Sequence, residues 1–488
     1  MINPLAVRRA GILLHLTSLP GGGVCGTLGP EAYRFVDFLA AAGQSVWQFL
    51  PVGPTHDDGS PYQCLSLHAG NPAYISAELL VSAGWLEASL AELPATAAIQ
   101  RRLLASAYQG FLQRAGEAER RHFSEFVETN RQWLEDYALY TVLREAHHHV
   151  SWADWPPGLR DRDPASLQAA RHQYPDALER IRFEQFVFSQ QWRSLKEYAN
   201  RHGIFLFGDL PIFVAHDSAD VWAQRDYFQL DATGRPTVVA GVPPDYFSAT
   251  GQRWGNPHYR WERMEQEGFQ WWVTRIKTQL QLFDLVRIDH FRGFEAYWEI
   301  PVDHDTAMNG RWVHAPGDAL FDVLRGHFNP LPLVAEDLGL ITPEVEALRL
   351  RHGFPGMKIL QFAFDGGPAN PYLPHNHHHL AVVYTGTHDN DTTVGWYNAL
   401  SADARNYVND YLRCSGEPMP WPLISAALAS VATLAVIPMQ DVLALGSEHR
   451  MNIPGKPNGN WRWRFTWDQV GAGLAARLRR LCELYGRN

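Results

Sequence analysis

The amino-acid sequence predicts an α/β protein, a (β/α)8 TIM barrel with inserted, largely helical subdomains. Eight short apolar runs have the composition of buried strands, and helical patterns lie between most of them. A length of 488 residues fits one barrel with insertions, because barrels of this class often exceed about 250 residues. Acidic residues follow three of the runs, and this fold carries its function at the C-terminal ends of its strands. We therefore expect residues 1–488 to form a single catalytic barrel without a separate C-terminal domain.

The expected strands are short segments rich in β-branched and aromatic residues. In chain order they cover residues 11–16, 45–52, 204–212, 284–291, 333–338, 358–364, 381–387 and 434–439. Helical periodicity predicts helices over residues 31–42, 258–282, 318–327, 343–352 and 468–485, with two or three more between residues 391 and 430. No clear helical pattern lies between residues 364 and 381.

Two connections are too long for simple crossovers between strands. Residues 53–203 follow the second strand and are largely helical by pattern, so we expect an inserted subdomain. Residues 213–257 follow the third strand and are rich in Gly, Pro, Asp and aromatic residues, which predicts a structured loop rather than a helix. Loops at a barrel mouth serve as lids or binding edges, although a plain surface loop is an equally common outcome.

The composition favours a neutral substrate. A net charge of −10 disfavours nucleic acid and anionic membranes as partners. The chain has 18 tryptophans and 18 tyrosines, and aromatic rings suit the faces of sugars, although large cores also use them. The longest weakly polar run, residues 424–438, is shorter than a membrane span. We expect no membrane segment.

The four cysteines, Cys25, Cys64, Cys414 and Cys482, are far apart and lack metal-ligand spacing. They indicate reduced thiols in a cytoplasmic protein. Histidine clusters at residues 147–149 and 375–379 have no Cys, Asp or Glu at ligand spacing, and solvated loops explain them better than a metal site. We expect neither a metal nor a cofactor.

The stretch from Asp284 to Gly293 places charged residues in a run typical of a buried strand. Side chains two positions apart share a face, so Arg287 and Asp289 would lie side by side while His290 points to the other face. A neighbouring arginine favours the ionised carboxylate that a nucleophile requires. A purely structural ion pair at a strand end would produce the same pattern.

Acids at three strand ends predict carbohydrate chemistry. Asp289 and Glu336 would follow neighbouring strands and hold their carboxyls near the roughly 5 to 5.5 Å separation of a retaining glycosidase. Asp289 would attack the anomeric carbon, while Glu336, with its pKa raised by the neighbouring charge, would act as acid and then base. Asp389 would stabilise the distorted ring. The adjacent acids Asp337 and Asp391 remain alternatives, because the sequence does not determine strand register.

Motifs along almost the whole chain resemble those of the amylomaltases, the bacterial 4-α-glucanotransferases related to plant disproportionating enzyme and, more distantly, to α-amylases. The three acids lie in Arg287-Ile-Asp-His290, Ala335-Glu-Asp-Leu-Gly339 and Thr387-His-Asp-Asn-Asp-Thr392. Further matches are Gly11-Ile-Leu-Leu-His-Leu-Thr-Ser-Leu-Pro20, Ser60-Pro-Tyr-Gln63, Gly208-Asp-Leu-Pro-Ile-Phe-Val-Ala215, Asp217-Ser-Ala-Asp-Val-Trp222, Trp254-Gly-Asn-Pro257 and Asn460-Trp-Arg-Trp-Arg464. Thr27 departs from the pattern, which commonly has an aspartate there.

The resemblance implies that Asp289 is the nucleophile, Glu336 the acid/base and Asp389 the transition-state stabiliser. It also implies sugar contacts from four polar side chains and stacking from two aromatic ones: Asp209, Arg287, His290, His388, Tyr62 and Trp254. Taken alone, Tyr62 and Trp254 would more often be packing residues, and Asp209 would equally cap a turn. Malto-oligosaccharides, amylose, glycogen or starch chains would be donors and acceptors, and long glucans would cyclise.

Two other functions fit parts of the pattern. An α-amylase-like hydrolase would share the three acids, but residues 208–215 lack the Asn-His pair that usually follows the third-strand aspartate in that family. A non-catalytic glucan-binding barrel would not need all three acids. If transfer is the function, the loop from Gly241 to Trp254, with Tyr246 and Phe247, would hold the acceptor and exclude water.

Overall fold

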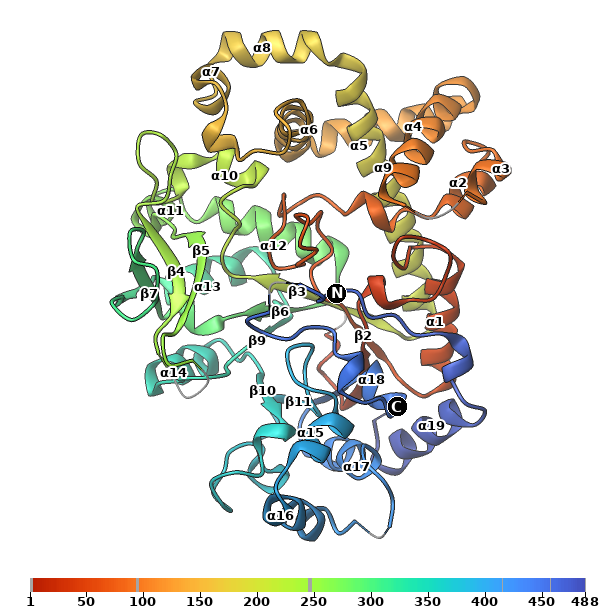
Figure 1. The fold of residues 1–488 in the computed structure, drawn as a ribbon, viewed down its shortest axis with the longest axis vertical. Coiled ribbons are helices and arrows are strands. Elements are labelled where there is room, and N and C mark those ends of the chain that lie inside the picture. The colour runs from red at the N-terminus through yellow and green to blue at the C-terminus, as the bar shows by residue number, and fades with distance from the viewer. Residues whose placement is uncertain (1–2, 94–95, 245–247, 415, 457, 488) are drawn as a thin grey trace.

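A computed structural model describes residues 3–93, 96–244, 248–414, 416–456 and 458–487. Its centre is one sheet of eight parallel strands in the order β10-β11-β12-β1-β2-β3-β6-β9 (Figure 1). The two edges meet where the Ala335 N–H donates to the Pro355 carbonyl at 2.9 Å. This contact closes the sheet, and the predicted (β/α)8 barrel is confirmed.

All eight predicted strands are present, but each ends earlier than predicted. The apolar pattern continues beyond them into buried loops at the barrel mouth, such as Leu14 and Leu16 after β1 and Phe49 and Leu50 after β2. The strands are β1 (Arg9–Leu13), β2 (Val46–Gln48), β3 (Phe205–Pro211), β6 (Leu285–Asp289), β9 (Leu333–Ala335), β10 (Gly356–Ile359), β11 (Ala381–Tyr384) and β12 (Leu434–Pro438).

Helices cover the barrel where the sequence predicts them, with one exception. The single helix predicted over residues 258–282 is wrong, because Gly268 and Phe269 both adopt positive φ angles, 65° and 53°, which interrupt a right-handed helix. The covering helices are α1 (Pro30–Ala41), α9 (Pro175–Arg201), α11 (Trp261–Gln266), α12 (Gln270–Leu282), α13 (Gly317–His327), α14 (Pro343–Arg351), α15 (Thr393–Ala399), α16 (Ala402–Leu412), α17 (Trp421–Ala429), α18 (Met439–Val442) and α19 (Leu474–Leu484). Only 3₁₀ turns at Leu360–Phe362 and Pro374–Asn376 connect β10 to β11.

Helices also dominate the long segment between β2 and β3, and Figure 1 shows them together at the top of the view. They are α2 (Ala77–Ser82), α3 (Ala88–Ala91), α4 (Ala97–Arg114), α5 (Glu117–Thr129), α6 (Arg131–Ala146), α7 (Pro157–Arg160) and α8 (Pro164–Gln173). The 27-residue helix α9 leads from this group back to the barrel. Gln185 on α9 fixes the connecting loop, because its amide exchanges two hydrogen bonds with the backbone of Gly70 at 2.8 and 2.9 Å.

A second sheet, which the sequence analysis missed, lies beside the barrel. Its antiparallel strands run in the order β5-β4-β7-β8: β4 (Val238–Val242), β5 (Gln252–Pro257), β7 (Ala296–Pro301) and β8 (Arg311–His314). Residues 213–257, expected to be loop without helix, therefore contain two strands and the short helix α10 (Ala219–Ala223). The sheet joins chain segments on both sides of β6.

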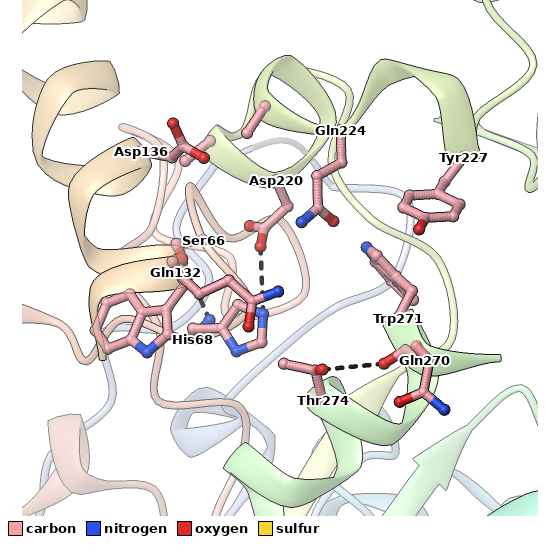
Figure 2. Close-up of a pocket in the computed structure, with 13 residues that line it drawn as sticks. Ser66, His68, Gln132, Asp136, Asp220, Gln224, Tyr227, Gln270, Trp271 and Thr274 are labelled. Carbon is pink, nitrogen blue, oxygen red and sulfur yellow. Dashed lines mark hydrogen bonds and ion pairs between the residues drawn. The ribbon is translucent and has the colours of Figure 1, made fainter. Parts of the chain in front are cut away.

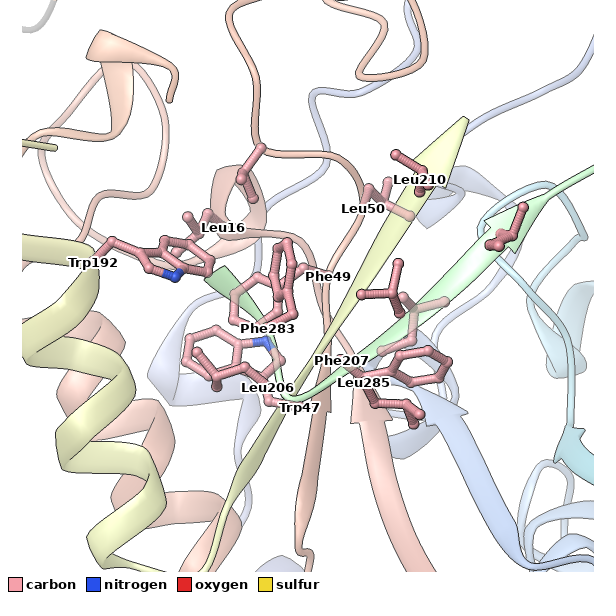
Figure 3. Close-up of a cluster of buried hydrophobic side chains, with 14 of the residues drawn as sticks. Leu16, Trp47, Phe49, Leu50, Trp192, Leu206, Phe207, Leu210, Phe283 and Leu285 are labelled. Carbon is pink, nitrogen blue, oxygen red and sulfur yellow. The ribbon is translucent and has the colours of Figure 1, made fainter. Parts of the chain in front are cut away.

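Large aromatic side chains fill the space between α9 and strands β2, β3 and β6 (Figure 3). Trp47 stacks on Phe49 at 4.3 Å between ring centroids, and Phe49 meets Trp192 of α9 at 5.4 Å. Truncating one such ring typically costs about 3–5 kcal/mol. Gly208 permits the close packing, because a Cβ there would lie 2.2 Å from the Phe283 ring. This core fixes the strands whose C-terminal ends carry the acids.

Among the described residues, no helix combines the length and the apolar character needed to cross a membrane. The four cysteines are free thiols.

Candidate active site

Arg287 lies between two carboxylates at the C-terminal ends of adjacent strands. It is opposite Asp209 in the register of β6 with β3, and its Nη1 donates to both Asp209 oxygens at 2.8 Å. Its Nη2 pairs with Asp289 Oδ1 at 2.8 Å. Burial opposes its charge, but the two carboxylates outweigh burial and raise the pKa of Arg287 well above its ordinary value. The expected adjacency of Arg287 and Asp289 is confirmed.

Tyr62 and His388 extend this group across the barrel mouth. The Tyr62 hydroxyl donates to Asp209 Oδ2 at 2.8 Å. Its ring stacks on the His388 imidazole, with centroids 5.2 Å apart and an angle of 15° between the planes. His388 Nε2 lies 3.2 Å from Asp389 Oδ2. The loops after β2 and β11 therefore meet above β3 and β6.

Asp389 has two further partners that the sequence analysis missed. Asn452 Nδ2 donates to Asp389 Oδ1 at 2.6 Å, and Arg450 donates to the backbone carbonyl of Asp389 at 2.8 Å. Burial would raise the pKa of Asp389, but His388 and the hydrogen bonds from His388 and Asn452 lower it well below its usual range. Asp389 therefore carries a fixed negative charge.

Glu336 lies opposite Asp289. Ile288 pairs with Ala335 in the register of β6 with β9, so Asp289, the last residue of β6, and Glu336, the residue after β9, lie at the same level of the barrel. The Glu336 carboxylate accepts the backbone N–H of His290 at 2.7 Å and that of Leu338 at 2.9 Å. Retaining glycosidases use two carboxyls on neighbouring elements, and the register places Asp289 and Glu336 at neighbouring strand ends.

The pKa of Glu336 is raised to about 7. Burial is the largest cause and the negative charge of Asp289 adds to it, while Arg287 and the two backbone N–H groups act in the opposite direction. The neighbouring charge expected from the sequence therefore contributes, but burial is the larger cause. Glu336 can therefore hold or release a proton near neutral pH.

His290 and Trp254 form the side of the site next to the second sheet. His290 has a positive φ of 54°, which turns the chain at the end of β6. Its ring packs edge-to-face against Trp254 of β5 with centroids 4.8 Å apart. Burial lowers the pKa of His290 to about 4, so the ring is neutral at physiological pH. Tyr246 and Phe247, which we also expected in this loop, lie outside the described residues.

The two alternative acids have other partners. Asp337 pairs with Arg349 at 3.2 Å and accepts the Met357 N–H at 2.6 Å. Asp391 accepts the Ser447 hydroxyl at 2.8 Å and the Thr392 N–H at 2.7 Å. These contacts favour structural roles for both acids and leave Asp289, Glu336 and Asp389 around Arg287.

All nine residues expected at the site are thus connected through direct contacts or close electrostatic interaction. Trp461 joins them from the C-terminal segment, with its ring 6.0 Å from Tyr62 and 5.9 Å from His388. The only sequence signal for Trp461 is its position in the motif at residues 460–464. Within the described ranges, no three His, Cys, Asp or Glu side chains are grouped to hold a metal ion. The chemistry available is that of paired carboxyls beside aromatic rings.

A family model described as 4-alpha-glucanotransferase matches residues 14–469. The 4-alpha-glucanotransferase of Thermus thermophilus is 50% identical over 491 residues, with 98% of both chains covered. That of Synechocystis sp. is 48% identical over 495 residues, again with 98% of both chains covered. The structure of amylomaltase from Streptococcus agalactiae in complex with acarbose matches with a TM-score of 0.95 at 36% identity, covering 99% of this chain and 100% of that one. The similarity extends over the barrel and its insertions.

Proposed function

Because the chain belongs to the 4-alpha-glucanotransferase family, it transfers α-1,4-glucan segments between malto-oligosaccharides, and we propose that it does so by retaining double displacement. Asp289 is the nucleophile, Glu336 the general acid and base, and Asp389 the stabiliser of the distorted sugar. Amylose, glycogen and starch chains serve as longer donors and acceptors. A long chain whose own non-reducing end reaches the site is released as a cyclic glucan.

In the first step an oxygen of Asp289 forms a bond to the anomeric carbon of the donor. The glycosidic bond breaks, its electron pair remains on the leaving oxygen, and Glu336 donates a proton to that oxygen. The product is a glycosyl ester on Asp289 and a shortened glucan. The pair Arg287–Asp289, with its 2.8 Å contact, supports this role by orienting the attacking carboxylate.

In the second step Glu336, now a carboxylate, removes the proton from the 4-hydroxyl of an acceptor sugar. The acceptor oxygen forms the new glycosidic bond and Asp289 is released as a carboxylate, so the anomeric configuration is retained. A pKa of about 7 suits a group that must act first as an acid and then as a base.

Asp389 stabilises the transition state. Positive charge develops on the sugar ring there, and Asp389 supplies a negative charge held by His388 and Asn452. The six remaining residues bind the sugar. Asp209, Arg287, His290 and His388 hydrogen-bond the glucosyl unit beside the cleaved bond, and Tyr62 and Trp254 stack on the flanking units.

The observation that carries this proposal is the alignment of the Arg287-paired Asp289 with a carboxyl whose pKa is about 7. The free cysteines further support a reducing compartment, and we place the enzyme in the cytoplasm.

Incubation with maltotriose tests the proposal. Transfer of a maltosyl unit between two maltotrioses yields glucose and maltopentaose, further rounds give other chain lengths, and no new reducing ends form. An α-amylase-like hydrolase, the second candidate because it shares the three acids, yields only shorter chains and new reducing ends. A glucan-binding protein without activity yields no products.

A further inference from the structure

The hydrogen bond between Tyr62 and Asp209 joins two separate segments of the chain at the active site. Tyr62 lies in the loop after β2, Asp209 lies on β3, and the hydroxyl is 2.8 Å from Asp209 Oδ2. This contact aligns the two side chains only if each backbone is held in place, because a hydrogen bond weakens as its distance and angle change. Two buried charged residues outside the site, Arg275 and Asp220, contact these backbones.

Arg275 holds the C-terminal end of β3. It is fully buried on α12, and its guanidinium donates to the carbonyl of Pro211 and, at 2.9 Å, to that of Ile212. Pro211 is opposite Asp289 in the register of β3 with β6, and Asp209 lies two residues earlier on the same strand. Arg275 therefore contacts the backbone directly after Asp209 and beside the end of the strand that carries Asp289.

Tyr259, just after β5, shares this contact. Its hydroxyl accepts Arg275 Nη1 at 2.9 Å and donates to the Ile212 carbonyl at 2.5 Å. The rings of Trp271 and Trp272 lie 5.4 and 4.8 Å from the guanidinium carbon. A planar guanidinium has donors in a fixed geometry, so it can bind several oxygens at once and hold them in a defined arrangement.

Asp220 holds the segment that follows Tyr62. Asp220 lies on α10, and its Oδ2 accepts the backbone N–H of Leu67 at 2.8 Å. The adjacent Ala219 N–H donates to the carbonyl of Leu65 at 2.9 Å. The start of α10 is thus attached to the chain only a few residues beyond Tyr62.

Asp220 carries a buried negative charge. Figure 2 shows its carboxylate directed at the His68 ring, and the distance from Asp220 Oδ1 to His68 Nε2 is 3.7 Å. Burial lowers the pKa of His68 to about 4, so this ring is neutral and does not compensate the carboxylate. Burial raises the pKa of Asp220 to about 6, whereas the Leu67 N–H and the charge of Arg275 act in the opposite direction. Asp220 is therefore ionised at neutral pH, with Arg275 as its cationic neighbour.

These two residues lie directly behind the contact between Tyr62 and Asp209. Arg275 lines a small cavity of about 30 Å³ together with Tyr62 and Asp209. Ser66 lines this cavity and also the neighbouring one shown in Figure 2, which Asp220 lines. Buried charges cost free energy, and both are placed where the two segments of the active site meet.

We propose that Arg275 and Asp220 are positioning residues for the transfer reaction, which fix the two backbones that the Tyr62–Asp209 hydrogen bond joins. Arg275 sets the position of Asp209 and of the strand end beside Asp289, and Asp220 sets the position of Tyr62. Neither residue touches the substrate. The inference rests on the proposed roles of Tyr62, Asp209 and Asp289 at the sugar.

A double-mutant cycle tests the role of Asp220. We expect Asp220→Ala to lower kcat/KM for maltotriose about tenfold, because Tyr62 loses its fixed position. In a Tyr62→Ala background the same change should cost less than about twofold, since the side chain that Asp220 positions is gone. Asp220→Asn should recover part of the loss, because its side-chain oxygen can still accept the Leu67 N–H, and it carries the measurement if Asp220→Ala does not fold.

Arg275→Met tests the other side of the contact. It removes the donors to the Pro211 and Ile212 carbonyls and should lower kcat about tenfold to a hundredfold, both with Tyr62 and in the Tyr62→Ala background. Should Arg275→Met fail to fold, Tyr259→Phe takes its place, because it removes the hydroxyl that Arg275 and Ile212 share, and it should lower kcat at least about threefold.

The matched control is Asp284→Ala. Asp284 accepts the Leu206 N–H at 2.8 Å, the same type of contact as that of Asp220 but at the opposite end of β3. This variant should have a lower thermal midpoint and an unchanged kcat/KM. All values of kcat and KM are measured well below the midpoint of each variant, so that the folded protein is compared.

Two results would overturn the proposal. A folded variant of Asp220 or Arg275 with unchanged kcat/KM, like Asp284→Ala, would show a purely structural role. An equal loss from Asp220→Ala with and without Tyr62 would show that Asp220 acts by another route. Failure of the proposed function would appear separately, as the absence of transfer products when the wild-type enzyme is incubated with maltotriose.

Discussion

The contacts of Asp289 support its assignment as the nucleophile. Arg287 is shared between Asp289 and the fully buried carboxylate of Asp209, so Asp289 is oriented while its side chain stays 32% exposed and accessible to a sugar. We predict that Asp289→Asn reduces turnover by at least about 10³-fold, equivalent to about 4 kcal/mol, because the amide cannot form the glycosyl ester. Glucan binding should persist through the aromatic residues. Disproportionation of maltotriose and glucan affinity should be measured together.

The matched control for Asp289→Asn is Asp337→Asn. Asp337 belongs to a buried ion pair with Arg349, so this change should lower thermal stability and largely preserve turnover. Turnover of Asp289→Asn within about tenfold of wild type would contradict the nucleophile assignment, since about 1.4 kcal/mol is too little for loss of covalent catalysis.

The raised pKa of Glu336 predicts the pH dependence of the first step. Cleavage of the donor needs protonated Glu336, and its pKa is about 7. We therefore expect kcat/KM for maltotriose to decline as pH rises through about 7, by about tenfold per unit above that value. A maltosyl fluoride donor needs no proton on its leaving group, so glycosyl-enzyme formation from it should lack this alkaline decline and survive Glu336→Gln. An identical alkaline decline with both donors would assign the titration to another group.

Sequence reasoning found the residues that the strands themselves supply. Asp289 and Glu336 belong to or directly follow buried apolar runs. A charged residue in such a position is energetically costly, and its presence therefore indicates a functional role. Asn452 could not be found in this way, because it reaches Asp389 from a loop 63 positions later and belongs to no periodic pattern. The choice between Glu336 and Asp337 also needed strand register, which the structure supplies through the pairing of Ile288 with Ala335.

At the scale of elements, the loop that carries Asp389 is fixed at both ends by one buried carboxylate. Asp441 on α18 accepts the Thr385 hydroxyl at 2.5 Å, and it accepts the hydroxyl and N–H of Thr393 at 2.7 Å each. Thr385 follows β11 and Thr393 begins α15, so Asp441 joins the two ends of the segment that contains His388 and Asp389.

We predict that Asp441→Ala lowers kcat by about tenfold to a hundredfold, equivalent to about 1.4–2.7 kcal/mol, because the stabilising charge loses its fixed position. Asp441→Asn should restore part of the loss, since its side-chain oxygen can still accept the Thr393 N–H. The measurement is kcat with maltotriose beside the thermal midpoint. A purely structural role predicts a lower midpoint with kcat unchanged in the folded fraction.

Strand β5 places Trp254 at the site. We predict that this side chain influences whether an acceptor sugar or water reacts with the glycosyl ester. A hydrolase and a transferase share the glycosyl ester, so the outcome depends on how well an acceptor is held and water excluded. Trp254→Ala should lower the transfer rate and raise the ratio of hydrolysis to transfer, with little change in thermal midpoint. New reducing ends counted against glucose released from maltotriose give this ratio. The control is Trp312→Ala, which removes a more exposed ring on β8. An equal ratio of hydrolysis to transfer in both variants would show that Trp254 serves only in packing.

The elements themselves differed in how well the sequence predicted them. Each barrel strand is a compact apolar run, and burial on both faces makes such runs visible. The second sheet is assembled from Val238–Val242, Gln252–Pro257, Ala296–Pro301 and Arg311–His314, which pair across β6 and two helices. Such long-range pairing leaves no local signal, and the glycine- and proline-rich composition of residues 241–257 indicates a loop when read alone.

At the scale of the whole molecule, the chemistry and the anchoring of the C-terminal segment occupy opposite ends of the strands. The acids follow the C-terminal ends, whereas Arg9 begins β1 at the other end. There the fully buried guanidinium of Arg487 donates to the carbonyls of Leu428 at 2.5 Å, Arg9 at 2.8 Å, and Ser430 and Ala432 at 2.7 and 3.0 Å. One side chain thus ties the segment after α19 to the first strand and to the turn after α17.

We predict that Arg487→Ala destabilises the protein by on the order of 3 kcal/mol, because Arg9 and Ala432 lose a buried donor while Arg8 still serves Leu428 and Ser430. The thermal midpoint should fall by roughly 3 °C, and kcat at low temperature should be unchanged, since the site is at the other end of the barrel. Arg479→Ala is the matched control: Arg479 also donates to two carbonyls, of Ala40 and Ala41, but it is exposed and water can replace it. Scanning calorimetry and maltotriose turnover measure the two quantities.

Two outcomes would contradict this prediction. Equal midpoints for the two variants would show that burial of the Arg487 contacts adds nothing to stability. A loss of kcat in Arg487→Ala would show that the two ends of the barrel are not independent.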